Sequence, residues 1–420
     1  MIRKSLFLAV VSLLFGHQIQ GVVHPYIYVS NYISGNVSVI DTTTRTRLTT
    51  IPVGTQPTGG AFNIDGSQVY IPNLANGVAD AGTVSVIDVA SNTVVATITG
   101  FTFGPAVLGF AFTNDGRTAY ISSGTSSTHN VVYVVDTVAH QITSSITVGD
   151  QPTVMVITPD GAYLYVTNLS TNTTLRLPTV SIISTTTHQV TKTLTPATSL
   201  GNNFSETITL HPSGSAVYIP IYGSGTTGLY VIDTSTQTGS IASCSLTAPH
   251  NISITPKGGQ LFICNNKLTT LATANLNIVD QIYSIPNSFE SLVSNKGKHL
   301  YILSVGPAPY PLSFSVMDVY SHEQIGETLN LTATGQPLQN QGLAMSLDDR
   351  YAYIVNPDQN RVAVIHATTQ TLVKTIDVGS NPLAIAGPFV ASSHVNPTQS
   401  SLLDAVRFYN NRPLQKGEGP

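Results

Sequence analysis

Apolar and polar residues alternate in short runs along most of the chain, and one run recurs at a nearly constant spacing. It ends in Asp in most copies, which read VSVID (37–41), VSVID (84–88), VYVVD (132–136), LYVID (229–233), LNIVD (276–280) and FSVMD (314–318), with degenerate copies VSIIS (180–184) and VAVIH (362–366). Neighbouring copies end 47 to 49 residues apart, except for one interval of 38. Alternation with period two predicts β-strands, and a fixed period in this range predicts stacked supersecondary units.

A second phrase recurs in the same order. It reads YVTN at 165–168, with near copies YVSN (28–31), YIPN (70–73), FICN (262–265) and YIVN (353–356). We expect this tetrad to end a strand, with its Tyr and Val half-buried between sheets. We expect its Asn to bond its own backbone two residues further on, and the Asp of the first phrase to play the same part in its own turn.

Each repeat predicts four strands, named A to D. One repeat places them at 153–157, 162–167, 180–184 and 188–195. Asp160-Gly161 lies between strands A and B and predicts a tight hairpin whose two central residues take positive φ. The equivalent pairs are Asp65-Gly66, Asp115-Gly116, Ser213-Gly214, Lys257-Gly258 and Lys296-Gly297.

These repeats predict an all-β protein with a single β-propeller of about eight four-stranded blades. One four-stranded sheet cannot bury both of its faces alone, so neighbouring sheets must cover it. Seven blades is the alternative, if the short repeat around 280–318 is not a full blade. Blade one begins at Tyr26 with strand B, and the connector VGSNPLAIAG (378–387) matches VGTQPTGGAF (53–62) and VGDQPTVMVI (148–157). We therefore expect residues 383–387 to complete blade one and close the ring.

The segments outside the ring have their own signals. Arg3 and Lys4 precede an apolar stretch that is too short to span a bilayer, so residues 1–21 are predicted to be a signal peptide, with a retained N-terminal anchor as the alternative. The propeller is predicted over 22–397, without a stable membrane span, and residues 398–420 are predicted to form a tail with a short helix capped at Ser401. This organisation indicates a secreted, periplasmic or cell-surface protein.

Charged residues are scarce, at 9% of the chain, and Trp is absent. A surface made of Thr, Ser, Asn and Gln suits strands and argues against nucleic-acid binding, which needs clustered Lys and Arg. The two cysteines, Cys244 and Cys264, fall on strands that are not neighbours. Two separate buried thiols are therefore favoured over a disulfide, although an export compartment would permit one.

The tetrads, the alternating runs and the V-G-x-x-P connectors together resemble the YVTN-type β-propeller repeat proteins, which include exported bacterial propellers and archaeal surface-layer proteins. The resemblance covers roughly residues 26 to 387. It implies the architecture and an extracytoplasmic setting, and it implies little about activity, because the repeated phrases belong to the scaffold.

The candidate binding surface is the face that carries the B–C loops. The loops 74–83, 122–130, 169–179, 266–275 and 305–313 are all longer than the loop 32–36, and uneven loops on an even scaffold are where binding usually resides. The large or charged side chains on this face, which are candidates for binding a protein, glycan or envelope polymer, are Arg176, Lys267, Tyr310 and Arg361. The sequence thus favours a non-catalytic binding scaffold, with a surface-layer or assembly component as one alternative.

An enzyme, such as a lactonase-like hydrolase or a dehydrogenase-type propeller, is the other alternative. No nucleophile motif, catalytic residue or cofactor-binding motif is recognised, and the main carboxylates on strand A are Glu206 and Glu290. His140, His188 and His322 fall at equivalent C–D turns and should be spread around the rim. His211 and His250 are weak metal-binding candidates, because two His without a nearby acidic or thiolate partner make a poor site.

Overall fold

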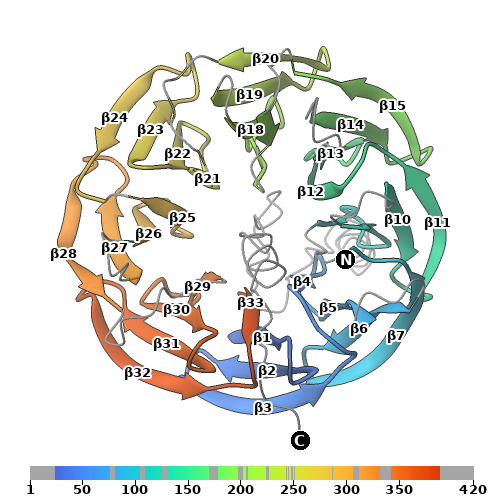
Figure 1. Ribbon diagram of the computed structural model, residues 1–420, viewed down its shortest axis with the longest axis horizontal. Helices are drawn as coiled ribbons and strands as arrows, with labels where there is room; N and C mark the ends of the chain where they lie inside the picture. The colour runs from blue at the N-terminus through green and yellow to red at the C-terminus, as the bar shows by residue number, and fades with distance from the viewer. Residues whose placement is uncertain are drawn as a thin grey trace, which may run out of the picture.

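The computed structural model describes residues 24–75, 81–104, 109–124, 130–169, 178–196, 202–204, 207–223, 227–242, 244, 246, 249, 251–285, 287–305, 312–331 and 342–387. All 33 elements in these ranges are β-strands. They form eight antiparallel sheets around a common axis, as the blades of a propeller (Figure 1). The prediction of eight blades is confirmed, and the seven-blade alternative is wrong. The predicted signal peptide and the predicted C-terminal helix lie outside the described residues.

Each blade runs from an inner strand A to an outer strand D. From blade 1 to blade 8, the inner strands are β33 (Pro382–Ala386), β4 (Ala61–Phe62), β8 (Phe110–Phe112), β12 (Pro152–Ile157), β17 (Thr209–Leu210), β21 (Asn251–Ile254), β25 (Ser288–Val293) and β29 (Leu343–Met345). The B strands are β1 (Tyr26–Asn31), β5 (Gln68–Asn73), β9 (Thr118–Ser122), β13 (Tyr163–Asn168), β18 (Ala216–Gly223), β22 (Gln260–Cys264), β26 (His299–Val305) and β30 (Tyr351–Asn356). In blade 5, β16 (Asn202–Phe204) pairs with the end of β18 beyond β17.

The two remaining strands of each blade lie further from the axis. The C strands are β2 (Asn36–Asp41), β6 (Gly82–Asp88), β10 (Val131–Asp136), β14 (Thr179–Ser184), β19 (Gly228–Asp233), β23 (Leu268–Ala272), β27 (Leu312–Asp318) and β31 (Arg361–His366). The D strands are β3 (Thr46–Pro52), β7 (Thr93–Phe101), β11 (Gln141–Thr147), β15 (Gln189–Leu194), β20 (Thr238–Ala242), β24 (Ile278–Ile282), β28 (Gln324–Asn330) and β32 (Thr371–Asp377).

The ring closes through the end of the chain, as predicted. β33 pairs antiparallel with β1, with Tyr28 opposite Ala386 and Ser30 opposite Ala384. The first blade therefore contains strands from both ends of the described chain, which lie side by side in Figure 1. This pairing leaves β1 without a free edge on the axis side.

The core is divided among the seams between blades. The described residues contain eight clusters of buried apolar side chains, and each cluster lies mainly between two neighbouring blades. The cluster between blades 4 and 5 also includes Ala384 of β33. Ile27 and Val29 of β1 pack against blade 8, whereas Tyr28 packs against blade 2. Because successive side chains of a strand point to opposite faces, each blade contributes to two seams.

The aromatic residue that opens each tetrad is fully buried rather than half-buried as predicted. The eight equivalent residues are Tyr28, Tyr70, Tyr120, Tyr165, Tyr218, Phe262, Tyr301 and Tyr353, and none is more than 3% exposed. Several of their hydroxyls reach the next blade: Tyr28 donates to Asn92 Oδ1 at 2.7 Å, and Tyr353 to the Thr42 carbonyl at 3.2 Å. The prediction that these rings pack between sheets is confirmed.

The A–B turns have a different geometry from the one predicted. The glycines of six turns take φ between 67° and 78°, whereas the residue before each glycine does not have positive φ. Where that residue is Asp, its carboxylate binds the backbone, as Asp65 Oδ1 does in accepting from the Ser67 N–H at 2.9 Å. The Asp-Gly pair thus marks the turn correctly, although only its second residue needs the left-handed region.

Blade 6 also differs from the predicted alignment. The run 276–280 is not strand C, because it covers the end of the C–D turn and the start of β24. Strand C is β23, and Ala272 takes the place of the terminal Asp: its carbonyl accepts from the Leu276 N–H at 2.8 Å, as the Asp88 carbonyl does from Asn92. The connection between β22 and β23 is consequently 265–267, not the long loop predicted at 266–275. Period-two alternation is common to half-buried C and D strands, so it does not distinguish them.

The tetrad Asn has a different role from the one predicted in three blades. Instead of bonding its own backbone two residues on, the Asn168 amide crosses to strand C and donates to Thr179 Oγ1 at 3.1 Å and Ser181 Oγ at 3.0 Å. Asn31 and Asn73 make equivalent bonds. The predicted local bond occurs at Asn265, whose Oδ1 accepts from the Lys267 N–H. Asn in the tetrad therefore mainly ties strands B and C together.

Candidate functional site

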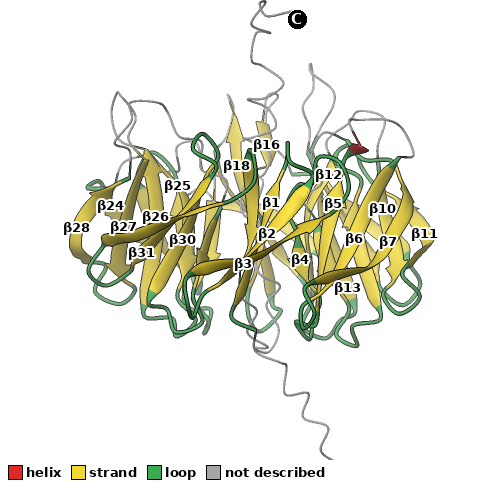
Figure 2. Ribbon diagram, turned by 90° about the horizontal axis from the view of Figure 1, so that it is seen from below, coloured by secondary structure: helices red, strands yellow, loops and turns green. Residues whose placement is uncertain are grey.

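The connections fall on two opposite faces of the ring (Figure 2). The A–B and C–D turns share one face. In four blades the threonine that follows strand C donates to the carbonyl of the A–B turn glycine, as Thr137 Oγ1 does to Gly116 O at 2.5 Å and Thr273 Oγ1 does to Gly258 O at 2.6 Å. The B–C loops share the other face with the D–A connectors, where the Leu169 N–H donates to the Gln151 carbonyl at 3.0 Å.

The face with the C–D turns is uniform. The residue four positions after the end of strand C takes φ between 51° and 59° in every blade, at Arg45, Asn92, His140, His188, Gln237, Leu276, His322 and Gln370. Where strand C ends in Asp, its carboxylate accepts from backbone N–H groups of the turn, and hydrogen bonds from Ser321 and Tyr320 lower the pKa of the Asp318 carboxyl. His366 makes the same contact through Nδ1, which accepts from the Thr369 N–H at 3.2 Å.

The histidines of the C–D turns belong to this scaffold, as predicted. His188 Nδ1 lies 3.1 Å from the Tyr120 hydroxyl of the preceding blade. His322 Nδ1 lies 3.6 Å from Asp280 Oδ2, also across a seam. His140, His188 and His322 are in blades 3, 4 and 7, so they are distributed around the rim and do not meet.

The face with the B–C loops is uneven. Residues 32–35 join β1 to β2, and residues 357–360 join β30 to β31. Longer connections follow β5, β9, β13 and β26, the longest being 169–178 between β13 and β14. Blade 6 has the shortest connection, at 265–267, so the length of the B–C connection varies from blade to blade.

Two of the predicted binding residues lie on this face. Lys267 occupies the short turn of blade 6, and its Nζ lies 2.7 Å from Gln281 Oε1 and 3.0 Å from the Tyr283 hydroxyl. Arg361 begins strand C of blade 8, and its Nε donates to Asp377 Oδ1 at 2.8 Å. Blade 7 separates them, so they do not form one site. Arg176 and Tyr310 lie outside the described residues.

His211, one of the two weak metal-binding candidates, lies on the opposite face. His211 belongs to the A–B turn of blade 5, where its Nδ1 lies 2.7 Å from Ser213 Oγ. A Cβ added to Gly258 of blade 6 would come within 2.3 Å of His211 Nε2, so this ring fills a seam. His250 and Glu206 are not among the described residues. Among those that are described, no group of three or more His, Cys, Asp or Glu side chains has the arrangement to hold a metal.

The remaining candidate groups are buried. Glu290 on β25 is 2% exposed, and its Oε1 accepts from the Leu343 N–H of blade 8 at 3.2 Å. Cys244 and Cys264 are both free thiols, as favoured from the sequence. Burial raises the pKa of the Cys264 thiol to about 12 and that of Cys244 to about 11, which keeps both thiols protonated at neutral pH.

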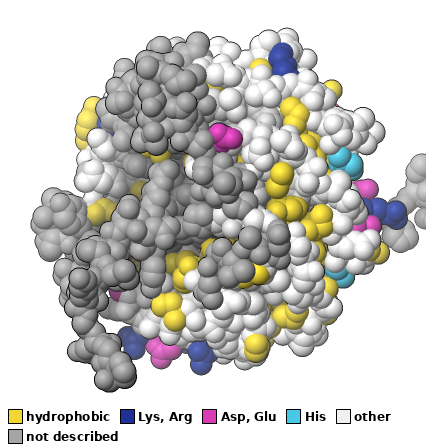
Figure 3. Space-filling model, turned by 45° about the vertical axis from the view of Figure 1, so that its right-hand side comes forward, with side chains coloured by type: hydrophobic (Ala, Val, Ile, Leu, Met, Phe, Trp, Pro, Cys, Tyr) yellow, Lys and Arg dark blue, Asp and Glu magenta, His cyan; other side chains and the backbone are white. Residues whose placement is uncertain are grey.

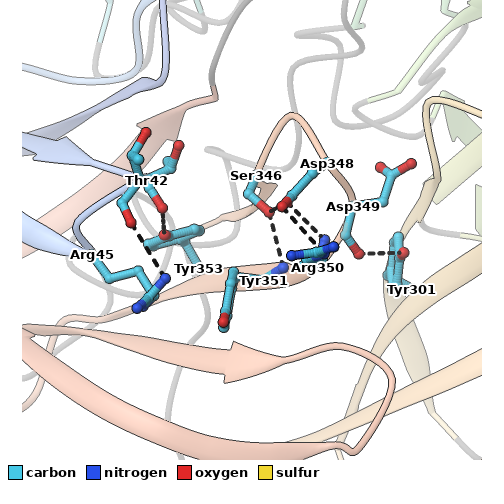
Figure 4. A network of polar contacts seen from close by, with 10 residues as sticks. Thr42, Arg45, Tyr301, Ser346, Asp348, Asp349, Arg350, Tyr351 and Tyr353 are labelled. Atoms are coloured by element: carbon cyan, nitrogen blue, oxygen red, sulfur yellow. Dashed lines mark hydrogen bonds and ion pairs between the residues drawn. The ribbon is translucent and has the colours of Figure 1, made fainter.

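Blade 8 carries a polar network that the sequence did not predict, with contacts to blade 1 on one side and to blade 7 on the other (Figure 4). The Arg45 guanidinium lies 4.7 Å from the centre of the Tyr351 ring, and the Tyr301 hydroxyl donates to the Asp349 carbonyl at 3.1 Å. Asp349 takes φ 60° at the A–B turn position that glycine occupies in six other blades. Its Oδ1 accepts from the Asn295 N–H at 3.2 Å, and burial raises the pKa of its carboxyl.

The outer surface is largely uncharged. Lys, Arg, Asp and Glu side chains are sparse and scattered on the side shown in Figure 3, where most of the described surface is neither charged nor apolar. On this side, the few charges are therefore isolated among uncharged polar groups and backbone. Within the described part of the chain, no helix is long and apolar enough to cross a membrane.

Comparison with known proteins supports the fold and leaves the family open. No protein-family model matches the chain. Antigen Lp49 of Leptospira interrogans is 29% identical over 152 residues, which are 33% of this chain and 30% of that protein. The match thus spans less than a third of the relative's length, and it carries no statement about activity.

Solved structures share the architecture at low identity. The dihydro-heme d1 dehydrogenase NirN matches over 90% of this chain and 76% of its own, with a TM-score of 0.65 and 14% identity. AztD from Citrobacter koseri matches over 87% of this chain and 99% of its own, with a TM-score of 0.60 and 13% identity. The periplasmic gluconolactonase PpgL of Pseudomonas aeruginosa matches over 76% and 98%, with a TM-score of 0.53 and 15% identity. At such identities the likeness shows the propeller alone.

Proposed function

We propose that this protein is an extracytoplasmic, non-catalytic binding scaffold that holds a protein or a glycan on the face of its B–C loops. The observation that carries the proposal is the contrast between the two faces. One has eight turns of the same geometry, bonded to their own blades, while the other has connections that differ in length from blade to blade. Variation confined to one face of a rigid scaffold is the usual arrangement of a binding surface.

Replacement of the B–C connections tests the proposal. Residues 169–178 and 74–81 would each be replaced by the short connection of blade 1, residues 32–35, and the variants would be compared with wild type in pull-downs from envelope extracts. We expect loss of one or more partners with unchanged thermal unfolding. A matched control replaces Val138 and Tyr320, which are exposed on the opposite face, by Thr. Retention of every partner by the loop variants, or equal loss in the control, would refute the choice of face.

Export is tested separately. We expect the mature chain to begin near residue 22 and to be recovered from the periplasm, cell surface or medium. N-terminal sequencing of the fractionated protein measures this. A chain that keeps residues 1–21 would favour the retained anchor, and a chain confined to the cytoplasm would contradict the extracytoplasmic setting.

The enzymatic alternative rests on the likeness to a gluconolactonase, which is a likeness of fold. A divalent metal assay and a lactone-hydrolysis screen on the purified protein address it. A stoichiometric metal ion together with lactone turnover would replace the binding-scaffold proposal, and the absence of turnover would leave binding as the function to be explained.

A further inference from the structure

Blade 6 carries a cation and an exposed aromatic ring side by side on the B–C face. The short turn 265–267 brings Lys267 close to the end of β24, and the chain continues from β24 into Tyr283. Tyr283 is 69% exposed, which is high for an aromatic side chain of this size. A large exposed ring on a rigid scaffold provides apolar contact area at little entropic cost, since few rotatable bonds become ordered on binding.

Lys267 is held beside this ring. Its ammonium nitrogen lies 4.7 Å from the centre of the Tyr283 ring, 3.0 Å from the hydroxyl oxygen of the same residue and 2.7 Å from Gln281 Oε1. These two hydrogen bonds and the cation–π contact fix the position of a side chain that is otherwise flexible. The ammonium group is therefore pre-positioned next to the open ring.

The charge of Lys267 has no acidic partner among the described residues. Its hydrogen-bond acceptors are the neutral oxygens of Gln281 and Tyr283, and the ion pairs of the described chain do not include it. Arg361, the other described cation that was predicted for this face, is in contrast paired with Asp377. Lys267 is thus a half-buried cation that remains available to an anionic group of a ligand.

The exposed side chains next to this pair along the two segments are polar and uncharged. Asn266, Ser284 and Asn287 are exposed, and the Asn287 N–H donates to the Asn266 carbonyl at 3.1 Å, which ties the two segments together. The Asn287 amide also donates to the Val305 carbonyl of blade 7. An exposed ring, one available cation and several amide or hydroxyl groups are complementary to a molecule with an apolar face, one carboxylate and several hydroxyls.

We propose that Lys267 and Tyr283 form a subsite for an acidic sugar residue, a uronate of an extracellular or envelope polysaccharide. The Tyr283 ring packs against the C–H face of the pyranose, the Lys267 ammonium pairs with its carboxylate, and the amides accept and donate hydrogen bonds to its hydroxyls. One cation beside one exposed ring matches a single uronate residue, which carries one carboxylate next to a C–H face. An anionic membrane is disfavoured as the partner, because it is bound by several clustered cations and does not need an exposed ring next to one of them. This inference rests on the proposed binding function and specifies its ligand.

The test uses a defined pair of probes. Calorimetric titration of the full-length mature protein with tetragalacturonate is compared with titration of the fully methyl-esterified tetramer, which keeps the rings and lacks the charges. We expect measurable binding of the acid and about tenfold or greater weakening with the ester, the loss typical of one charged hydrogen-bonded contact. Lys267→Gln should weaken binding of the acid by the same factor without affecting the ester, and Tyr283→Ala should weaken both.

The chain offers matched controls on the opposite face. Tyr320 is 72% exposed in a C–D turn, and Lys257 is exposed in the A–B turn of the same blade 6. Tyr320→Ala and Lys257→Gln should leave binding unchanged, and all four variants should keep the wild-type melting temperature. Failure of wild type to bind tetragalacturonate, or equal binding by Tyr283→Ala, would overturn the subsite. Pull-down partners lost only on replacement of other B–C loops would then show that the binding face is correct and the uronate assignment wrong.

Discussion

At the scale of single residues, the connectors explain why glycine recurs before the D–A turn. A Cβ added to Gly54 would lie 2.7 Å from the Asn73 side chain, and Gly149 and Gly379 meet Asn168 and Asn31 in the same way. The glycine of the V-G-x-x-P phrase and the asparagine of the tetrad are therefore two halves of one packing contact. The glycine is required because the asparagine side chain occupies the space that a Cβ would need.

This contact predicts a specific loss of stability. Gly54→Ala should destabilise the fold by about 1–3 kcal/mol, the usual cost of overpacking a buried site. Gly259→Ala is the control, because a Cβ there meets nothing within 4 Å, and it should change stability by less than about 1 kcal/mol. Urea unfolding of the three proteins measures the difference, and a neutral Gly54→Ala would show that the two phrases are not coupled.

The tetrad tyrosines give a second prediction at this scale, because their hydroxyls are not equally satisfied. Tyr28 donates to Asn92, whereas the buried Tyr165 hydroxyl has no hydrogen-bond partner among the described residues. Burial raises the pKa of Tyr165 to about 12, so the group stays neutral. Tyr28→Phe should cost about 0.5–1.5 kcal/mol, while Tyr165→Phe should be neutral or stabilising.

Thermal unfolding of the two tyrosine variants distinguishes these outcomes. Both substitutions remove one oxygen from a fully buried ring and leave the packing of the ring unchanged. Equal losses in the two variants would mean that the Tyr165 hydroxyl has a partner, such as an ordered water, that supports it as well as Asn92 supports Tyr28.

At the scale of elements, irregular backbone recurs at two places in the blades, the C–D ladders and the A–B turns. Seven of the eight C–D ladders, all of them within the described residues, have a register shift, which is absent between β19 and β20. Such bulges twist an outer edge strand and hinder edge-to-edge association. The A–B turns likewise depend on one residue in the left-handed region, which Asp349 supplies in blade 8.

Asp349 predicts a pH dependence with a definite sign. Burial raises the pKa of its carboxyl in the folded state above the ordinary 3.8, so the folded protein binds this proton more readily than the unfolded chain. The carboxyl therefore lowers stability as the pH rises from about 4 through the raised pKa. Asp349→Asn, which keeps a residue that tolerates positive φ, should be more stable than wild type at pH 7, and the difference should shrink towards pH 4.

Asp115 provides a control of opposite sign. A hydrogen bond from the Thr113 hydroxyl lowers the pKa of the Asp115 carboxyl, so its contribution to stability is present above about pH 4 and is lost as the pH falls through the lowered pKa. Asp115→Asn should be less stable than wild type at pH 7 and should approach it in acid. Melting temperatures between pH 3 and pH 8 test both signs, and parallel curves for all three proteins would contradict the assignment.

At the scale of the whole molecule, closure depends on one pairing. β33 covers the inner edge of β1, and its Leu383 and Ala384 are 5% exposed. A ring without this strand would expose an edge and one side of two seams. The same closed arrangement keeps the eight blades in fixed positions, which is what a multi-blade binding face requires.

Truncation tests the closure. A chain ending at Asn381 should lose about 3–5 kcal/mol of stability, from the buried apolar side chains of β33, and should associate through the exposed edge of β1. A chain ending at Gly387 keeps every described strand and should unfold like the full-length protein. Urea unfolding and gel filtration measure both effects, and equal stability of the two truncated chains would show that closure contributes little.

The sequence by itself determined the architecture of this protein. Its period, its alternation and its turn dipeptides are local properties, and each of eight similar units must bury its faces against neighbours, so the repeats specify a closed ring of strands. The closing strand was also predictable, because the phrase at 378–387 repeats two internal connectors. The lengths of the loops also predicted that the turns of one face would be uniform and that the B–C connections of the other face would differ in length.

Only the tertiary structure decided the details that depend on contacts between strands and turns, both within a blade and between blades. The alignment of blade 6 was missed because alternation is the same in half-buried C and D strands, and the exposed pair of Lys267 and Tyr283 was hidden by that error. Asp349 was missed because its turn has no glycine, and the pairing of Gly54 with Asn73 joins phrases that are distant along the chain. Such contacts depend on which strands and turns lie side by side in the folded protein. The pattern of residues along one strand does not specify which residues lie against it.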